Sequence, residues 1–188
     1  MTRREIECLP VAIVGAGIRG RMYAEAIRSL PQALLAGVCD VEGRRAHELA
    51  DRFGVPAFTD AAEMAARCGA AAAIIATPDF AHRDPAVAAA GAGLDLLVEK
   101  PLATTLEDAR AIDRAVRETG VRCMVGFENR WNPPVVPARQ SVERGELGRM
   151  LSCTSTLDDR IDVPTRMLPW LGRSSPGWMA MYGWCSAR

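Results

Sequence analysis

The chain has 188 residues, of which 49% are hydrophobic and 24% are charged, and this composition is typical of a globular protein with a real core. Its 23 basic and 23 acidic side chains cancel, which argues against nucleic acid or an anionic membrane surface as a partner. No apolar run approaches the ~20 residues of a membrane span, and no signal-peptide core precedes Pro10, so we predict a cytoplasmic protein. The six cysteines are scattered, and we expect them to be reduced and to bind no metal.

The first predicted strand begins near Leu9 and ends in a glycine-rich turn. That turn consists of Gly15, Ala16, Gly17, Ile18, Arg19 and Gly20. Apolar residues then recur at helical spacing over residues 23–30. A strand followed by Gly-x-Gly-x-x-Gly and a helix is the motif in which the pyrophosphate of a dinucleotide binds at the helix start. We expect Gly15 to allow the tight turn, Gly17 the approach of the pyrophosphate, and Gly20 the close packing of helix on strand.

An acidic residue follows the second predicted strand. Asp40 comes directly after the apolar residues 34–39 and lies 20 residues beyond Gly20. A carboxylate there can accept hydrogen bonds from an adenosine ribose and repels a 2′-phosphate, so we predict NAD in preference to NADP. Arg44 and Arg45 keep NADP open as the alternative, because arginine pairs with phosphate. A second alternative is an ordinary turn with Asp40 as a solvated residue at the strand end.

The elements that follow alternate between helix and strand. They are predicted as helix 46–53, strand 57–58, helix 60–67, strand 70–76, helix 80–90, strand 95–98, helix 104–119 and strand 122–126. Asp60 with Glu63, and Thr104 with Glu107, resemble capping pairs that open two of the helices. Alternation with short connections predicts an α/β fold, a Rossmann-type doubly wound parallel sheet with helices on both faces.

The alternation of strands and helices ends after Gly126. A helix is predicted for residues 135–144, and residues 150–156 are predicted to form the first strand of a second domain. We therefore predict an NAD(P)-binding domain over residues 1–127. Residues 128–188 would be a connecting helix and the incomplete start of a second, α+β domain. The sequence after Asp158 shows no hydrophobic period typical of a helix or a strand, and we expect residues 157–188 to be poorly ordered.

Polar residues gather where the predicted strands end, which is where an open parallel sheet binds ligands. Besides the glycine turn and Asp40, they are Thr77, Pro78, His82, Glu99, Lys100, Asn129 and Arg130. Lys100 is the only lysine among the 23 basic residues, and an ammonium can assist proton transfer from a substrate hydroxyl. Each functional role has a structural alternative. Glu99 and Lys100 would form a surface ion pair, and His82 would satisfy a local carbonyl. Asn129 and Arg130 would be solvated polar groups of a turn.

Together these motifs resemble the Gfo/Idh/MocA family, the relatives of glucose–fructose oxidoreductase and inositol dehydrogenase, over residues 8–156. The resemblance is carried by Gly15-x-Gly17-x-x-Gly20, Cys39-Asp40, Ala76-Thr77-Pro78 with His82, Glu99-Lys100-Pro101-Leu102, and Val125-Gly126-Phe127 with Arg130. It implies an NAD(P)-dependent oxidoreductase that transfers hydride between the cofactor and a sugar, cyclitol or related hydroxy compound.

The resemblance also implies roles for the strand-end residues. Residues 15–20, with Ile18 and Arg19 in the turn, would bind the cofactor together with Asp40. The segment that holds Thr77, Pro78 and His82 would border its ribose and nicotinamide. Glu99 and Lys100 would lie beside the nicotinamide ribose and the substrate, with Lys100 as the catalytic residue. Asn129 and Arg130 would wall the nicotinamide end.

The chain departs from the family in its length. Members carry a second domain that usually supplies an Asp-x-x-x-His motif, whereas His47 and His82 are the only histidines here and both precede that domain. We interpret the chain as truncated or frame-shifted and expect it to bind cofactor without turning over substrate. Two alternatives stay open, a non-catalytic NAD(P)-binding module and a partner of a full-length paralogue. Homo-oligomer formation is left open too.

Overall fold

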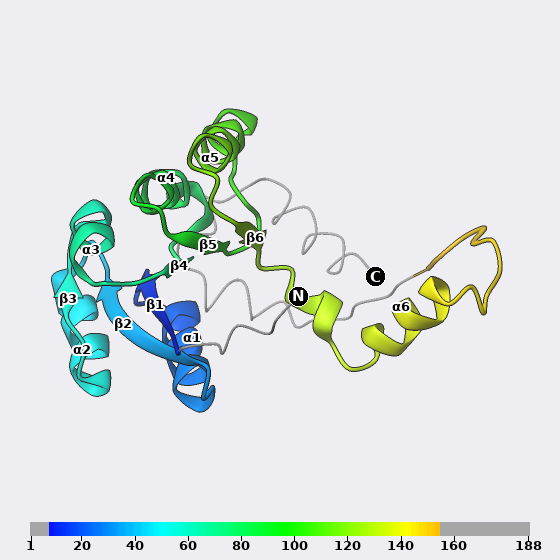
Figure 1. The fold of residues 1–188 in the computed structure, drawn as a ribbon, viewed down its shortest axis with the longest axis horizontal. Helices are drawn as coiled ribbons and strands as arrows, with labels where there is room; N and C mark the ends of the chain where they lie inside the picture. Colours follow the sequence, from blue (N-terminus) through cyan, green and yellow to red (C-terminus); the bar gives the residue numbers. More distant parts are fainter. Residues whose placement is uncertain (1–7, 155–188) are drawn as a thin grey trace, which may run out of the picture. The chain divides into compact units, whose positions relative to one another are not determined.

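The computed structural model describes residues 8–154, which divide into two compact units, 8–126 and 127–154 (Figure 1). The first unit runs through β1 (Leu9–Val14), α1 (Ile18–Ser29), β2 (Ala33–Cys39), α2 (Gly43–Phe53), β3 (Ala57–Phe58), α3 (Ala61–Arg67), β4 (Ala72–Ile75), a 3-10 turn (Asp79–Ala81), α4 (Arg83–Gly91), β5 (Asp95–Val98), α5 (Leu106–Thr119) and β6 (Cys123–Val125). Strand and helix alternate throughout this unit. None of the helices in the described part of the chain has the length and apolar character to cross a membrane.

The six strands form one parallel sheet in the order β3-β2-β1-β4-β5-β6. The chain fills one side of β1 with β2 and β3, then returns to place β4 on the other side. This reversal of direction makes β1 and β4 a topological switch point, where such sheets bind their ligands. Val14 pairs with Cys39 and with Ile75, so these strands end at one level. The predicted Rossmann-type doubly wound sheet is confirmed.

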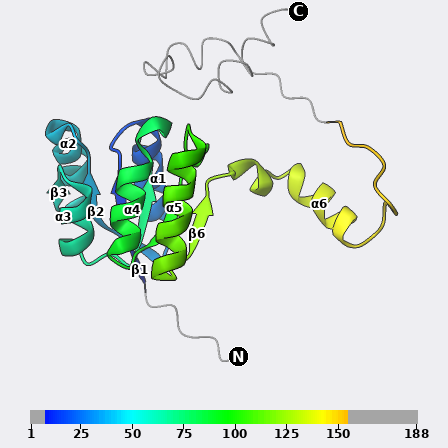
Figure 2. The same cartoon turned by 90° about the horizontal axis from the view of Figure 1, so that it is seen from above.

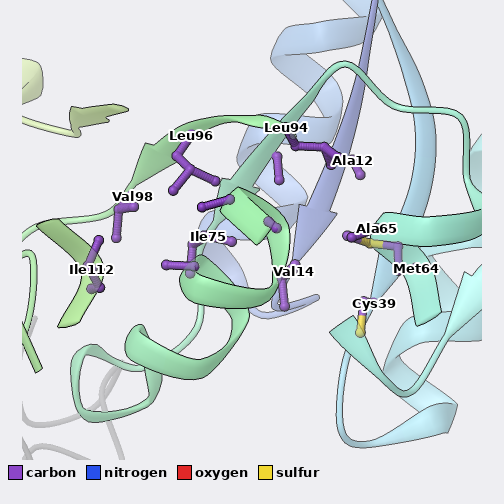
Figure 3. Close-up of a cluster of buried hydrophobic side chains, with 14 residues drawn as sticks. Ala12, Val14, Cys39, Met64, Ala65, Ile75, Leu94, Leu96, Val98 and Ile112 are labelled. Carbon is purple, nitrogen blue, oxygen red and sulfur yellow. The ribbon is translucent and has the colours of Figure 1, made fainter. Parts of the chain in front are cut away.

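Helices cover both faces of the sheet. α1 and α2 pack on one face, while α3, α4 and α5 pack on the other, with α4 and α5 side by side (Figure 2). Neighbouring strand residues point into opposite layers. Ile13 and Ile74 belong to the cluster under α1 and α2, whereas Val14 and Ile75 belong to the cluster under the other three helices (Figure 3). Burial on both faces explains why these strands read as continuous apolar runs.

α1 lies unusually close to β1. A Cβ atom on Gly20 would stand 1.8 Å from the carbonyl oxygen of Gly15, so no side chain fits there. Gly15 has φ +101°, and a Cβ on it would come 2.6 Å from the backbone of Ala76. The turn that Gly15 was expected to allow and the packing that Gly20 was expected to allow are both confirmed. Gly17 differs, since a Cβ there would meet nothing within 4 Å.

Several helix starts differ from the sequence prediction, among them that of α2, which begins at Gly43 instead of residue 46. The pair of Asp60 and Glu63 caps α3 as expected, with the Glu63 amide donating to the carboxylate at 2.7 Å. α5 begins at Leu106, and its N-cap is Thr105, one residue after the predicted cap Thr104. The Thr105 hydroxyl accepts from the Asp108 amide at 3.1 Å and donates to its carboxylate at 2.7 Å. The single helix predicted over residues 80–90 is a 3-10 turn followed by α4, which starts at Arg83.

The second unit holds a 3-10 helix (Glu128–Trp131) and α6 (Val135–Glu143). The guanidinium of Arg139 lies 5.4 Å from the centre of the Trp131 ring. Residues 150–154 form no strand, so the strand predicted over 150–156 is wrong for the part that is described. All six described strands belong to the sheet of the first unit, and a lone strand is not stable. The prediction for residues 157–188 falls outside the described residues.

The close approach of α1 to β1 predicts opposite effects for two glycines. Gly20→Ala should destabilise the fold by about 3 kcal/mol or more, because its Cβ overlaps a backbone oxygen that has nowhere to move. Gly17→Ala, in the same turn, should change stability by no more than about 0.5 kcal/mol. Urea denaturation of the two variants beside the original chain measures both. Equal destabilisation by the two alanines would contradict the observed packing.

The start of β5 is tied to β6 by Asp95, which accepts from the Arg122 amide at 2.8 Å and from its guanidinium. Hydrogen bonds from the side chain and the backbone of Arg122 lower the pKa of Asp95 below its ordinary value of 3.8. A lowered folded-state pKa adds stability above 3.8, and this contribution disappears as the pH falls through the folded pKa.

Asp95→Asn should therefore lower the denaturation midpoint slightly at pH 7, since both groups are near the surface. The difference from the original chain should shrink as the pH falls below 3.8 and vanish once the Asp95 carboxyl of the folded original chain is protonated. Asp113→Asn is the matched control, because that carboxylate pairs with Arg117 within one helix and should cost less. A difference that persists unchanged at low pH would argue against the ion pair as its cause.

Candidate functional site

The carboxyl ends of β1, β4, β5 and β6 form one row of turns. Hydrogen bonds that continue the strand ladder run from the amide of Ala76 to Val14 at 2.7 Å and from the amide of Glu99 to Ile75 at 2.9 Å. The Gly126 amide donates to Val98 at 2.7 Å. The glycine turn, the Thr77-Pro78 turn and the Glu99-Lys100 turn are therefore neighbours, as their places after parallel strands predict.

Asp40 is buried, with 8% of its surface exposed, so the alternative of a solvated strand-end residue is wrong. One carboxylate oxygen accepts from the Ala16 amide at 2.8 Å, and the other accepts from the Glu42 amide at 2.9 Å. These bonds tie the glycine turn after β1 to the turn after β2. Each oxygen of an ionised carboxylate has room for a second donor. Asp40 thus retains acceptor capacity that suits ribose hydroxyls.

The two arginines that could favour NADP lie beside acids. Arg45 pairs with Glu42 at 3.1 Å, and Arg44 lies 3.8 Å from Glu48. Both pairs are exposed, and pairs of this kind are weak. Each guanidinium nevertheless stands next to a negative charge, which reduces its attraction for a 2′-phosphate.

The start of α1 differs from the starts of α3 and α5. Those two helices have a side-chain cap and an acidic residue in the first turn, and α1 has neither. Its N-cap is Gly17, and a Cβ atom placed on Gly17 would meet nothing within 4 Å. The partial positive charge at a helix start attracts anions, and an acid in the first turn would compete with one. The site therefore fits a dinucleotide whose pyrophosphate binds here. Ile18, the first residue of α1, is exposed.

His82 is buried, with 1% of its surface exposed. Its Nδ1 lies 3.0 Å from the carbonyl oxygen of Pro101 and 3.2 Å from that of Leu102, while its Nε2 lies 3.0 Å from that of Thr77. The ring thus stands between the turn after β4 and the turn after β5. The alternative of a histidine that satisfies local carbonyls describes this geometry, and His82 shapes the site through the backbone.

The neighbours of His82 are also structurally engaged. The Thr77 hydroxyl donates to the carbonyl of Ala81 at 3.1 Å, and Pro78 is the N-cap of the 3-10 turn that leads into α4. Both residues are half-buried at the sheet edge. Their predicted contact with the cofactor stays a prediction.

Glu99 is buried, with 5% of its surface exposed, and it is held from α1. Its Oε1 accepts from the Tyr23 hydroxyl at 2.6 Å and lies 3.1 Å from Nε of Arg19. Its Oε2 accepts from the backbone amide of Lys100 at 3.2 Å. A solvated surface pair therefore does not describe Glu99. Lys100 itself is half-buried, and its peptide bond to Pro101 is cis.

Tyr23 was not recognised as a site residue from the sequence, where it counted only as an apolar position of the helix. One signal was available. Tyr23 follows Arg19 by four residues, so both side chains lie on one face of α1. The hydroxyl group of a tyrosine on the packed face of a helix needs a hydrogen-bond partner.

Asn129 and Arg130 lie in the 3-10 helix of the second unit, where both are exposed. Their assignment to the nicotinamide end of the cofactor stays a prediction. Cys39 lies next to Asp40 and is buried. Burial, and after it the charge of Asp40, raises the pKa of its thiol to about 12, so the thiol stays protonated.

Comparison with known proteins gives a family match. Residues 9–127 match GFO_IDH_MocA, described as an oxidoreductase family with an NAD-binding Rossmann fold. The scyllo-inositol 2-dehydrogenase (NAD(+)) of Bacillus subtilis is 36% identical over 140 residues, covering 73% of this chain and 41% of the relative. Levoglucosan dehydrogenase of Pseudarthrobacter phenanthrenivorans is 32% identical over 172 residues, covering 86% and 44%.

Solved structures agree in fold. The WlbA dehydrogenase from Bordetella pertussis, in complex with NADH and UDP-GlcNAcA, has a TM-score of 0.70 at 30% identity and covers 75% of this chain and 43% of its own. The scyllo-inositol dehydrogenase from Lactobacillus casei, with NAD(H) and scyllo-inositol bound, has a TM-score of 0.69 at 24% identity, over 74% and 42%. The matched region spans less than half the length of each of these relatives. The match over residues 9–127 and the glycine turn, Asp40 and Glu99-Lys100 at one sheet edge place the chain in the Gfo/Idh/MocA family of oxidoreductases.

Proposed function

We propose that this chain binds NAD, in preference to NADP, as the nucleotide-binding part of an oxidoreductase that acts on a polyol, sugar or related hydroxy compound. The start of α1 carries this proposal. It is open at Gly17, lacks a side-chain cap and a first-turn acid, and lies at the β1–β4 switch point beside the buried carboxylate of Asp40. The substrate class is supported by relatives named as inositol and levoglucosan dehydrogenases.

Each residue has a distinct task in this proposal. The backbone N–H groups at the start of α1 bind the pyrophosphate, and Asp40 accepts from the adenosine ribose. The nicotinamide supplies the hydride chemistry when it is bound. Lys100, beside the buried Glu99, holds a substrate hydroxyl or takes part in moving its proton. The turns that His82 connects define the wall of the nicotinamide side.

A second candidate is a nucleotide-binding module without catalysis. Its support is that the family match covers the NAD-binding Rossmann fold, residues 9–127. Hydride transfer needs the substrate carbon held against the nicotinamide with water excluded. An absorbance assay at the nicotinamide band with a panel of polyols and sugars separates the two candidates, because the module binds NAD and turns over nothing.

The first prediction from this proposal concerns Gly17. Gly17→Val places a branched side chain in the open space in front of α1 and should weaken NAD binding at least about tenfold, or 1.4 kcal/mol, by blocking the pyrophosphate. Stability should change little, since a Cβ atom at this position meets nothing within 4 Å. Titration calorimetry with NAD, together with a denaturation curve, measures both quantities. Equal affinity in the variant and the original chain would refute the proposed site.

The second prediction concerns the choice between cofactors. Asp40→Asn keeps the shape of the side chain but removes its charge, so the ratio of NAD affinity to NADP affinity should fall by about tenfold. Arg45→Gln is the control for the opposite influence and should leave or raise that ratio, because it removes a positive charge near the ribose. Calorimetry with both cofactors gives the ratios. A chain that already prefers NADP would show that the arginines outweigh Asp40.

A further inference from the structure

Glu99 connects α1 to the segment that carries Lys100. Arg19 and Tyr23, one helical turn apart on α1, both reach Oε1 of Glu99, at 3.1 Å and 2.6 Å. Oε2 accepts from the amide of Lys100 at 3.2 Å. The two oxygens of one carboxylate therefore face different parts of the molecule, one toward α1 and one toward the backbone of the only lysine.

A buried carboxylate remains charged only when its charge is compensated. The side chain of Glu99 is 7% exposed, and Arg19 supplies the opposite charge while Tyr23 donates a short hydrogen bond. An ionised carboxylate is also the stronger acceptor for the Lys100 amide. The two α1 residues thus determine how firmly Glu99 can hold the start of the Lys100-Pro101 segment.

The other end of that segment is held independently. His82 lies within hydrogen-bond distance of the carbonyl oxygens of Pro101 and Leu102. Lys100 is therefore flanked by two fixed points, one provided by α1 through Glu99 and one provided by His82. Loss of either removes one of these two points.

We infer that Arg19 and Tyr23 are positioning residues for Lys100, which act through Glu99 to fix the lysine where it faces the bound cofactor. The inference rests on the proposed function, in which Lys100 belongs to the cofactor site. It assigns α1 a second task, because the helix whose start receives the pyrophosphate also sets the position of the lysine. Arg19 then acts on Glu99 with its guanidinium, in addition to any backbone contact with the cofactor.

The single lysine makes this inference directly measurable. The full chain is treated with acetic anhydride, with and without saturating NAD, and the acetylation rate of Lys100 is read by peptide mapping, which separates it from the α-amino group. The original chain should show slower labelling when NAD is bound. In Tyr23→Phe and Arg19→Gln, labelling without NAD should be about fivefold faster, and the protection by NAD should fall by about the same factor.

Arg28→Gln is the matched control, since Arg28 is an exposed arginine of the same helix that pairs with Glu25. It should label like the original chain. Unfolding temperature and NAD affinity are measured on every variant. Rates at Lys100 that match the original chain in both Tyr23→Phe and Arg19→Gln, even with lower unfolding temperatures, would reduce these residues to a structural role and overturn the inference.

The two proposals fail in different ways. If the original chain shows no NAD binding by calorimetry, the proposed function is wrong, and the labelling rates without NAD still decide whether α1 positions Lys100. If NAD binds and protects Lys100 equally in all variants, the proposed function stands and the positioning inference is wrong.

Discussion

The contact between Gly20 and the Gly15 carbonyl determines where the rest of the nucleotide side can lie. A Cβ at Gly20 would stand 1.8 Å from that oxygen, so α1 can rest on β1 only because residue 20 is glycine. With α1 at this distance, its uncapped start falls at the switch point between β1 and β4, within reach of the turn that Asp40 braces through the Ala16 amide. The same placement brings the first turns of α1 over the end of β5, where Arg19 and Tyr23 meet Glu99. One packing distance thus underlies both ends of the proposed cofactor site.

Carboxylates at the sheet edge serve as braces as much as ligands. Asp40 joins two turns through the amides of Ala16 and Glu42, and Glu99 joins α1 to the backbone of Lys100. Both are buried, and a buried carboxylate that lost its partners would cost more free energy than its hydrogen bonds contribute. The rigidity of the edge therefore depends on complete partner sets. His82 completes the frame from the opposite side by connecting the turns after β4 and β5.

Much of the fold was predictable, because its signals are local. Apolar runs, the Asp60 cap and glycines such as Gly120, which ends α5 at φ +73°, mark elements without reference to distant residues. The start of α5 was misplaced by one residue because two overlapping pairs, Thr104 with Glu107 and Thr105 with Asp108, satisfy the same capping pattern. The strand expected at 150–154 failed because a strand needs a partner that local sequence does not reveal. The site followed the same rule. Its strand-end positions were predicted from parallel topology. The link between Tyr23 and Glu99 spans 76 residues, and the four-residue spacing of Arg19 and Tyr23 does not identify Glu99 as their shared partner.

The start of α1 shows how the fold leaves room for a ligand. α3 and α5 satisfy their first amides with Asp60 and Thr105, and each places acids in its first turn. α1 has Gly17 at the equivalent position and no acid, although a cap contributes about 1 kcal/mol to a helix. Such a loss is tolerable because α1 is stabilised by the burial of Ala24 and Ile27 against the sheet, and because Glu99 fixes its first turns from the side. Amides left without a side-chain partner at a helix start that packing has already immobilised are preorganised for an anion, so the helix binds without having to move.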